Sequence, residues 1–483
     1  MKTRIIPLLL SLLTITGAYG QEKWDLLKCV EYALKNNISV RQTDLQAKLS
    51  ELALKQDRAG QLPSFNFNGS SGYRLGRSEN PTTGVFEDNN FLNFGMQIQS
   101  QVNLFNWFSR KRTIEASELT LAADNEQTKK IQNDIALNVA VAYLQVLLGK
   151  EQVNLAKVQA EQTKAQLDIT RRRVDAGTLP ELNAAELEAQ LARDSSGLVT
   201  AEGSVQQLQL QMKALLNLDA SVPFDIVVPL VNVIPVEPLA ELQPDAVYAS
   251  AMANLPQQKV NELRLKSALK TVAAAKGNLY PSVSAFGSLF SNAISFKREI
   301  YDQVLTGYSA GAGLRANIGG TFYPVEIPVI QDGTTVIGYF KPDKIGTQFR
   351  NNFGQNIGIG LSVPIFNGRQ ARTAWDRSKL QVKQWELTKE QNDMTLKQDI
   401  YKAYTDAVTA MQKFNANKKT VEISQKAYDY SQKRYDLALL STLELITSQN
   451  NLQRAKIDML YAQYDYIFKM KLLEFYKGQG LKL

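Results

Sequence analysis

The chain has 483 residues, with 55 Lys and Arg against 47 Asp and Glu, and a formal net charge of +8. The basic residues are scattered among glutamates, which excludes a nucleic-acid binding surface. There is no histidine and one cysteine, Cys29, so no intrachain disulfide can form and the commonest metal ligand and general base is missing. A G-x-x-x-x-G-K-[ST] nucleotide loop is also absent. We therefore predict a protein that is not an enzyme and has no cofactor and no metal ion.

The first twenty residues, MKTRIIPLLLSLLTITGAYG, predict a secretory signal. Two basic residues precede a short apolar run, and small residues follow at positions 18 and 20. We expect cleavage after Gly20 and an exported chain that begins at Gln21, without lipidation. Beyond this segment there is no continuous apolar run long enough for a membrane-spanning helix. Cys29 lies inside a helical pattern and is interpreted as a packed small residue.

The rest of the chain consists of two copies of one unit. The stretch ALKNNISVRQTDLQAKLSELALKQDRAGQLPSF, from Ala33, aligns with AMANLPQQKVNELRLKSALKTVAAAKGNLYPSV, from Ala251, at an offset of 218. VNLFNWFSRKR, from Val102, aligns with VPIFNGRQAR, from Val363, at an offset of 261. The two offsets differ by 43 residues, which we place between Pro281 and Val363 of copy two.

This duplication predicts three segments in the mature chain. A first repeat covers residues 21–218 and a second repeat covers 245–483, each containing a helix, a β-hairpin and a long helical hairpin. Between them, residues 219–244 carry five prolines and are predicted to be an equatorial linker of short extended pieces. A long external loop, rich in Gly, Pro and Asn, is expected at 297–350 within the second hairpin.

The helical patterns are unusually long. The opening helices are predicted at residues 24–58 and 245–276, and each ends before a proline that starts a strand. Long helices follow at 109–176 and 369–437, and at 1.5 Å per residue each would reach roughly 100 Å. Apolar residues recur in them at three and four spacing, which fits either helices packed side by side in one wall or an ordinary antiparallel coiled coil.

The strand patterns alternate between apolar and uncharged polar residues. NFGMQIQSQVNLFN and NIGIGLSV each place apolar side chains on one face, and with PSFNFNGSSGYRL and PSVSAFGSLFSNAISF they make four strands per chain. A soluble sheet would bury the apolar face, whereas a membrane barrel would turn it to lipid and its amides to a water-filled lumen. The long helices favour the barrel, and because a barrel needs at least about eight strands, two, three or four subunits must share it. The predicted lipid-facing residues are Phe94, Met96, Ile98, Val102, Leu104, Ile357, Ile359, Leu361 and Val363.

In their order and duplication these motifs resemble the TolC-like outer-membrane efflux and secretion channels. The resemblance rests on ALKNN, the Pro-led strands at Pro63 and Pro281, VNLFN and VPIFN, and the turn motifs RVDAGTLPELNAAE and RYDLALLSTLELITSQ. It implies a mainly α chain with membrane β, in which long antiparallel helical hairpins form a periplasmic α-barrel continuous with a shared 12-stranded outer-membrane β-barrel.

The resemblance also implies function and partners. A homotrimer in the outer membrane, with its tunnel extending into the periplasm, would be the passive exit duct of a tripartite efflux or type I secretion system. A periplasmic adaptor (membrane fusion protein) and an inner-membrane pump would open it. The turns at the tunnel tip would dock the adaptor, which here means Ala176, Gly177, Thr178, Leu179, Ala438, Leu439, Leu440 and Ser441.

The pore constriction is carried over in the same way, and it comprises Glu444, Thr447, Tyr435, Leu440, Asn183 and Glu186. Three Glu444 carboxylates around one axis would favour cations and repel one another as the ring tightens. Relatives often have a second acid where Thr447 stands and a basic residue where Leu440 stands, so here we expect Tyr435 and packing to seal the closed state. The alternative is that all these residues are ordinary solvated helix residues.

A second hypothesis is a structural or adhesive surface stalk anchored by a small β-barrel, with the 297–350 loop as its contact surface. A continuous conducting lumen would separate a duct from such a stalk.

Overall fold

The computed structural model describes residues 23–79, 84, 86–88, 90–228, 237–437 and 439–478. The predicted signal, two prolines of the linker and Ala438 lie outside these residues. The chain divides into two units. The helical unit comprises the described residues within Met1–Lys55, Ile114–Val272 and Asp376–Leu483, and the strand unit those within Gln56–Thr113 and Ala273–Trp375.

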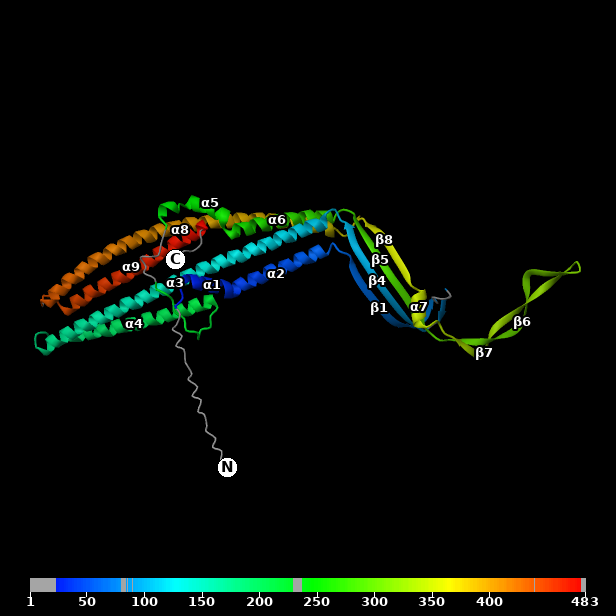
Figure 1. The fold of residues 1–483 in the computed structure, drawn as a ribbon, viewed down its shortest axis with the longest axis horizontal. Helices are drawn as coiled ribbons and strands as arrows, with labels where there is room; N and C mark the ends of the chain where they lie inside the picture. Colours follow the sequence, from blue (N-terminus) through cyan, green and yellow to red (C-terminus); the bar gives the residue numbers. More distant parts are fainter. Residues whose placement is uncertain are drawn as a thin grey trace, which may run out of the picture. The chain divides into compact units, whose positions relative to one another are not determined.

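Both copies contain the same succession of elements, except that copy two has the additional short helix α7 (Figure 1). Copy one contains α1 (Leu26–Asn36), α2 (Ile38–Ala59), β1 (Ser64–Arg74), β2 (Arg77–Glu79), β3 (Phe86–Asp88), β4 (Phe91–Phe105), α3 (Ser109–Asp175) and α4 (Glu181–Leu216). The short 3₁₀ helix η2 (Leu239–Glu241) leads into copy two. Copy two contains α5 (Pro244–Asn254), α6 (Pro256–Gly277), β5 (Ser282–Ser295), β6 (Arg298–Ile318), β7 (Thr321–Phe340), α7 (Ile345–Asn351), β8 (Gly354–Ser362), α8 (Gln370–Asp436) and α9 (Thr442–Lys477).

The ends of the helices coincide between the copies. The bounds of α1 and α2 become those of α5 and α6 when 218 is added. The bounds of α3 and α4 become those of α8 and α9 when 261 is added, so the long helices have 67 residues each and the return helices 36 each. The structural duplication therefore holds residue by residue on both sides of the inserted segment.

Each opening helix, expected to be continuous, is broken in two. The breaks fall at Asn37 and Leu255, whose ψ angles of 133° and 131° are extended. Asn37 accepts a hydrogen bond from the Ser39 backbone N–H at 2.9 Å and so caps α2. Leu255 precedes Pro256, which disfavours a helical conformation for the residue before it. The sequence carried both signals, an asparagine cap and a proline at a first helical position.

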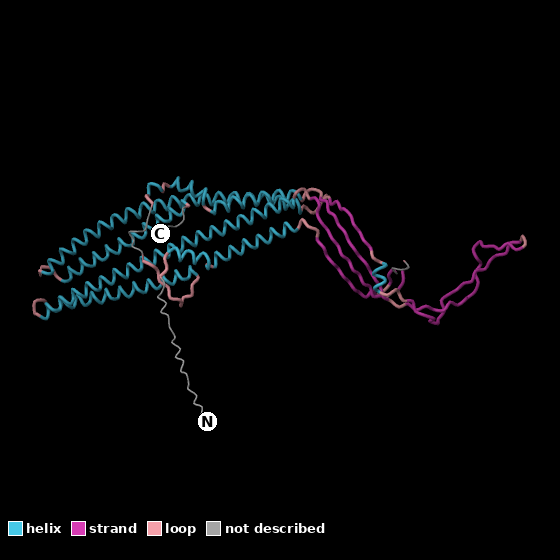
Figure 2. The backbone as a smooth tube through the Cα atoms, viewed as in Figure 1, coloured by secondary structure: helices cyan, strands magenta, loops and turns pink. Residues whose placement is uncertain are grey.

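In the helical unit each copy packs its short opening helix against its own long hairpin. Cys29 of α1 is fully buried with Val139 of α3 and Met212 of α4, which confirms its interpretation as a packed residue. Ala251 of α5 is fully buried with Ile400 and other residues of α8 and α9. The turn between α3 and α4 and the turn between α8 and α9 lie at the same end of this unit (Figures 1 and 2).

One helix, α3, contains an 18-residue stretch that is long and apolar enough by length and composition to cross a membrane. None was predicted from the sequence, because small and polar residues interrupt the apolar residues of this stretch. Of that stretch 44% is buried, and Val139, Val146 and Leu147 of α3 belong to the core shared with α1 and α4. Packing within the helical unit therefore accounts for the apolar content of α3.

The described parts of the linker are tied to the helical unit. Trp24 and Ile226 form a parallel β-bridge, with the Trp24 N–H donating to the Asp225 carbonyl at 3.0 Å. At the other end, the Glu237 N–H donates to Glu474 Oε1 at 2.9 Å. The linker is thus extended where it is described at residues 223–228, as its prolines indicated.

In the strand unit, the four predicted strands form one antiparallel sheet in the order β1-β4-β5-β8 (Figure 1). Neither β1 nor β8 has a second partner strand among the described residues. Because three successive antiparallel pairings separate them, β8 is antiparallel to β1. The two edge strands of the sheet therefore run in opposite directions.

The segment 297–350 is not the loop expected from its composition. It forms the antiparallel pair β6 and β7 and the short helix α7. Ile318 pairs with Thr321 across Gly319 and Gly320, whose φ angles are 61° and 90°. Two consecutive glycines between strand residues are a signature of a tight hairpin, because both central positions need positive φ. The Gly-Gly pair was therefore the signal for a hairpin. The high Gly and Pro content of the whole segment had instead indicated a loop.

Candidate functional site

The register of the sheet gathers the predicted apolar residues on one face. Ile98 pairs with Phe67 on one side and with Leu289 on the other, and Ala285 of β5 pairs with Ile359 of β8. Directly paired residues share a face, and alternate residues of a strand do so too. Phe94, Met96, Ile98, Val102, Ile357, Ile359 and Leu361 therefore lie on one face, called the apolar face below. Ile357, Ile359 and Leu361 are 90%, 72% and 69% exposed in the single chain.

Two of the predicted lipid-facing residues are not placed by this register. The pairing of β4 with β5 shifts between Asn103 and Phe105, so Leu104 between them has no partner residue and its face does not follow from the pairing. Val363 lies just past the end of β8 and is 51% exposed.

The opposite face, called the polar face below, carries mostly amides, serines and glycines. Gln97 pairs with Asn68 in β1, and Asn356 pairs with Ser288 between β8 and β5. Phe286 and Phe290 also lie on this face, at positions where the alternation in the sequence looked imperfect. Each ring lies over a glycine of β8, since a Cβ built on Gly358 would be 2.7 Å from Phe286 Cζ and one on Gly354 would be 2.5 Å from Phe290 Cζ. This pairing of phenylalanine with glycine was not predicted, although Phe recurs at even positions in β5 and Gly at even positions in β8.

Turning to the helical unit, the first turn ends α3 with a left-handed glycine. Gly177 has φ +71°, and its N–H donates to the Val174 carbonyl at 2.8 Å. The Thr178 N–H donates to the Arg173 carbonyl at 2.9 Å, which completes a Schellman motif. In the second turn, the Leu439 N–H donates to the Arg434 carbonyl at 2.8 Å, the equivalent bond.

The predicted docking residues are mostly exposed. Ala176, Gly177, Thr178, Leu439 and Ser441 are exposed, and Leu179 and Leu440 are half-buried. Leu439 exposes 64% of its surface although it is apolar. Both turns therefore expose uncharged backbone and side chains at the same end of the helical unit.

Glu444 lies at the start of α9 and closes a capping box with Ser441. Its Oε2 accepts from the Ser441 N–H at 3.0 Å and from the Ser441 hydroxyl at 2.9 Å, while the Glu444 N–H donates to Ser441 Oγ at 3.2 Å. The hydrogen bonds from Ser441, with a smaller contribution from Arg434, hold the pKa of Glu444 below its ordinary value of 4.5. Glu444 is therefore an exposed, ionised carboxylate whose position is fixed by its own helix, as the S-x-x-E spacing indicates.

The other predicted constriction residues differ in exposure. Thr447 is exposed and its hydroxyl donates to the Leu443 carbonyl at 2.8 Å, while Asn183 and Glu186 are half-buried on α4. Tyr435 is only 3% exposed and therefore does not line an open surface of this chain. Its hydroxyl lies 3.1 Å from Thr170 Oγ1 and 3.4 Å from Thr442 Oγ1, so it ties α8 to α3 and α9. This burial could not be predicted from the sequence alone, because it depends on which helices are neighbours.

A buried polar network next to the turns was not predicted at all. Gln449 of α9 donates to Thr163 of α3 at 3.0 Å, and Thr163 donates to Asp194 of α4 at 2.6 Å. Gln190 of α4 donates to Asp194 at 2.7 Å and to Asn450 at 3.1 Å. Polar residues at core positions of a long helix, such as Thr163 and Thr170 seven residues apart, were the available signal.

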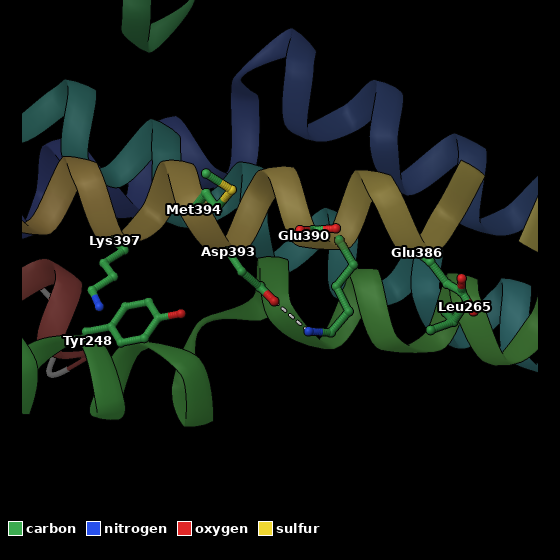
Figure 3. A pocket seen from close by; sticks show the side chains of 8 residues that line it. Tyr248, Leu265, Glu386, Glu390, Asp393, Met394 and Lys397 are labelled. Carbon is green, nitrogen blue, oxygen red and sulfur yellow. Dashed lines mark hydrogen bonds and ion pairs between the residues drawn. The ribbon is translucent and has the colours of Figure 1, made fainter. Parts of the chain in front are cut away.

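A hollow of about 320 Å³ lies between α5, α6 and α8 (Figure 3). Its acidic and basic side chains are interspersed, with Lys389 bonded to Asp393 at 2.6 Å and Lys397 5.7 Å from the centroid of the Tyr248 ring. In the part of the chain that the structure describes, no group of three or more His, Cys, Asp or Glu side chains could hold a metal ion. The hollow is a solvated seam between helices, and we assign it no function.

Comparison with known families gives a match to the model of the outer membrane efflux protein family over residues 29–218 and 346–474. The chain belongs to this family. The two matched segments contain both long helical hairpins and strands β1, β4 and β8, which carry the turns and most of the two faces described above. The β6–β7 hairpin lies in the unmatched part between them.

Relatives in the outer membrane efflux protein family are distant in sequence and alike in fold. The outer membrane efflux protein BepC of Brucella suis biovar 1 (strain 1330) is 20% identical over 90% of this chain and 81% of that protein. The toxin and drug export protein A of Aggregatibacter actinomycetemcomitans is 21% identical over 92% and 83%. Among solved structures, CusC superposes with a TM-score of 0.73 at 16% identity, covering 96% of both chains. The Campylobacter jejuni CmeC outer membrane channel superposes at 0.70 and 17%, covering 95% and 86%.

Proposed function

We propose that the protein is the passive exit duct of a tripartite efflux or secretion system, working as a homotrimer in the outer membrane. Three copies of the four-stranded sheet would supply twelve strands for one closed barrel. The two helical hairpins of each subunit would form the wall of a tunnel that extends into the periplasm. An adaptor would dock on the turns and, with an inner-membrane pump, would open the tunnel.

The observation that carries this proposal is the open sheet with two unlike faces. In lipid an unpaired strand edge leaves backbone N–H and C=O groups without partners at a cost of several kcal/mol each, so a sheet in the membrane must close. The apolar face with Ile357, Ile359 and Leu361 suits the lipid side, and the face with Gln97 and Asn68 suits a water-filled lumen. The edge strands β1 and β8 are antiparallel to each other, so β8 of one subunit can pair with β1 of the next in an antiparallel barrel.

The tip of the tunnel would be narrowed by a ring of Glu444 side chains. Three ionised carboxylates around one axis would favour cations over anions. Because the hydrogen bonds from Ser441 hold each carboxylate at its own helix start, movement of the hairpins would carry the charges apart and widen the passage.

Disulfide crosslinking between subunits tests whether their sheets close into one barrel. In a background where Cys29 is replaced by Ala, cysteines are placed singly and together at Ser70 of β1 and at Gly358 or Gly360 of β8, and oxidised samples are run without reductant. We expect covalent dimers and trimers from a matching pair and none from single cysteines. Failure of every β1–β8 pair, with an oligomer mass other than a trimer, would contradict the shared barrel.

Conductance in a planar bilayer tests the duct itself. The crosslinked trimer should pass a small, cation-preferring current, because the strand edges are joined while the tips stay free. A stable trimer without any current, even with an adaptor added, would favour the surface stalk.

A further inference from the structure

A second hollow lies where the β6–β7 hairpin joins the four-stranded sheet. Its volume is about 440 Å³, and it is lined by the residues that connect β5 to β6 and β7 to α7. β5 begins five residues after α6 ends, so this hollow lies at the opposite end of β5, beside Ser295. Its basic lining residues are Lys297, Lys341 and Lys344, and we call it the lysine hollow.

One buried amide holds the two walls of the lysine hollow together. Gln348 of α7 is 8% exposed. Its Oε1 accepts from the Ile294 N–H at 3.0 Å, while its Nε2 donates to the Ile294 carbonyl at 2.8 Å and to the Asp343 carbonyl at 2.6 Å. The end of β5 and the connection from β7 to α7 are therefore fixed relative to each other before any ligand binds.

Two further contacts make the hollow rigid. The Ser291 hydroxyl of β5 donates to the Phe349 carbonyl of α7 at 2.7 Å. The ammonium group of Lys297 lies 3.5 Å from the centroid of the Tyr339 ring in β7. An aromatic ring holds an ammonium group without neutralising its charge. Lys297 is thus positioned at the hollow and keeps its charge for a ligand.

Charge in the lysine hollow is unbalanced. Among the described lining residues, three lysines stand against one carboxylate, Asp343. Within the described part of the chain, no ion pair joins Lys297, Lys341 or Lys344 to a carboxylate. Like charges held close together repel one another, and a bound anion offsets that repulsion. Phosphate suits such a site, since lysine binds it as a point charge.

The lysines belong to the segment that distinguishes copy two. The family match ends at residue 218 and resumes at 346, so all three lie in the unmatched part. The corresponding connection of copy one, residues 75–90, contains one arginine, three acidic residues and no lysine. Each chain therefore has one lysine hollow, and the duplication itself does not account for it.

Resting on the proposed function for its placement, we propose that the lysine hollow binds a phosphate group carried by a sugar headgroup. This is the chemistry of phosphorylated glycolipids in the outer leaflet of the outer membrane. In the proposed duct, the end of the sheet away from the helices lies at the level of those headgroups. Pockets for small molecules have volumes of about 300–1,000 Å³, so the hollow has room for a sugar with its phosphate.

A binding titration on the full mature chain in neutral detergent tests the site. The probes are fluorescently labelled lipid A with both phosphates, the same lipid with its phosphates removed, and inorganic phosphate as a competitor. Retention of the labelled lipid on immobilised protein gives the dissociation constant.

Two matched variants separate the lysine hollow from general surface charge. Lys297→Gln, Lys341→Gln and Lys344→Gln are combined in one chain, which removes three charges and keeps polar side chains of similar length. The control changes three exposed lysines outside the hollow to Gln, namely Lys111, Lys418 and Lys419. Both variants lose the same net charge, so a difference between them reports the location of the binding site.

We expect the unmodified protein to bind the phosphorylated lipid at least about tenfold more tightly than the dephosphorylated lipid. The variant of the hollow should lose this preference and the control should keep it. Added salt should weaken binding, because it screens the attraction between the ammonium groups and phosphate. Equal affinity of the two lipids for the unmodified protein, or an unchanged preference in the variant of the hollow, would overturn the proposal.

Competition distinguishes the two sources of phosphate. Lipid that stays bound at an equal concentration of inorganic phosphate supports the headgroup, whereas displacement at that concentration would assign the hollow to free phosphate and overturn the headgroup. The result is also independent of the duct. A conducting trimer without lysine-dependent binding would overturn the lysine hollow alone. Lysine-dependent binding by a protein that forms no β1–β8 crosslinks would support the phosphate site and overturn its placement in the membrane.

Discussion

The hydroxyl of Thr170 on α3 lies 3.1 Å from the hydroxyl of Tyr435 on α8, and both side chains are buried. This bond joins the hairpin of copy one to the hairpin of copy two close to the turns. Neither group carries a charge, so the bond is insensitive to salt in a way that a surface ion pair is not. In the proposed duct, an opening movement that separates the two hairpins would have to break this bond.

Tyr435→Phe should weaken the tip. The change leaves the Thr170 hydroxyl buried with fewer partners, at a cost of roughly 1–3 kcal/mol. We expect a lower melting temperature and a larger mean conductance. The double variant Thr170→Val with Tyr435→Phe removes both hydroxyls of this bond and leaves only Thr442 without its tyrosine partner, so its stability should recover part of the loss while conductance stays high. A loss of stability with unchanged conductance would show that this bond does not hold the passage closed.

Glu444→Gln and Glu444→Ala separate charge from capping. Glutamine can keep the capping box, so Glu444→Gln should lose cation preference with little loss of stability. Glu444→Ala should lose cation preference and should in addition be less stable than Glu444→Gln, because the reciprocal cap is removed. Reversal potentials in a salt gradient and thermal unfolding measure the two effects. Retained cation preference in Glu444→Gln would remove Glu444 from the constriction.

The pH dependence of selectivity follows from the same carboxylate. Because its pKa in the folded state lies below 4.5, both the cap and the charge are complete above pH 4.5 and are lost as the pH falls through the lower folded-state value. Cation preference should therefore be constant from neutral pH to about 4.5 and decline below it. The Glu444→Gln variant should show no such decline, and a transition near neutral pH in the unmodified protein would point to another group.

Gly177→Ala should destabilise the first turn. An alanine at φ +71° costs roughly 1–2 kcal/mol, and the Schellman bonds around it would weaken. Gly203→Ala is the matched control, because Gly203 lies within α4 with nothing near its Cβ, and alanine there should stabilise by about 0.5–1 kcal/mol. Thermal unfolding of both variants should give shifts of opposite sign. Equal shifts would mean that the left-handed turn is not populated in the assembled protein.

Gly358→Ala tests whether the polar face lines the lumen. Its Cβ would lie 2.7 Å from Phe286 Cζ, so the ring must move off the sheet. We expect altered conductance, since the displaced ring would project into the passage. Gly287→Ala, on the apolar face with its nearest atom 3.6 Å away, should leave conductance unchanged. The reverse pattern would exchange the assignments of the two faces.

Local periodicity was sufficient to predict much of this chain. Alternation placed Met96 and Ile98 on one face, and the register agrees because a pleated strand admits only two faces. The duplication identified which segments of the two copies correspond, without any structural information. The S-T-L-E pattern at Ser441 was also a signal for the cap of Glu444, because a capping box needs Ser or Thr followed three residues later by Glu or Gln.

Contacts between elements that are far apart in the sequence could not be predicted from local periodicity. The burial of Tyr435 and its bond to Thr170 depend on two helices 265 positions apart in sequence meeting side by side. The ring of Phe290 over Gly354 depends on the pairing of β5 with β8 across the inserted segment. Neither contact leaves a local pattern strong enough to identify its partner.

The equal length of α3 and α8 restricts how this chain can change over evolutionary time. A deletion of seven residues from α8 alone would keep its heptad phase but draw its turn back by about 10 Å at 1.5 Å per residue. Tyr435 would then no longer meet Thr170, and one tip would stand short of the other. Lengthening or shortening of the hairpins must therefore occur in both copies together, whereas the connection between β5 and β8 has accepted 43 residues in one copy without altering the length of a single helix.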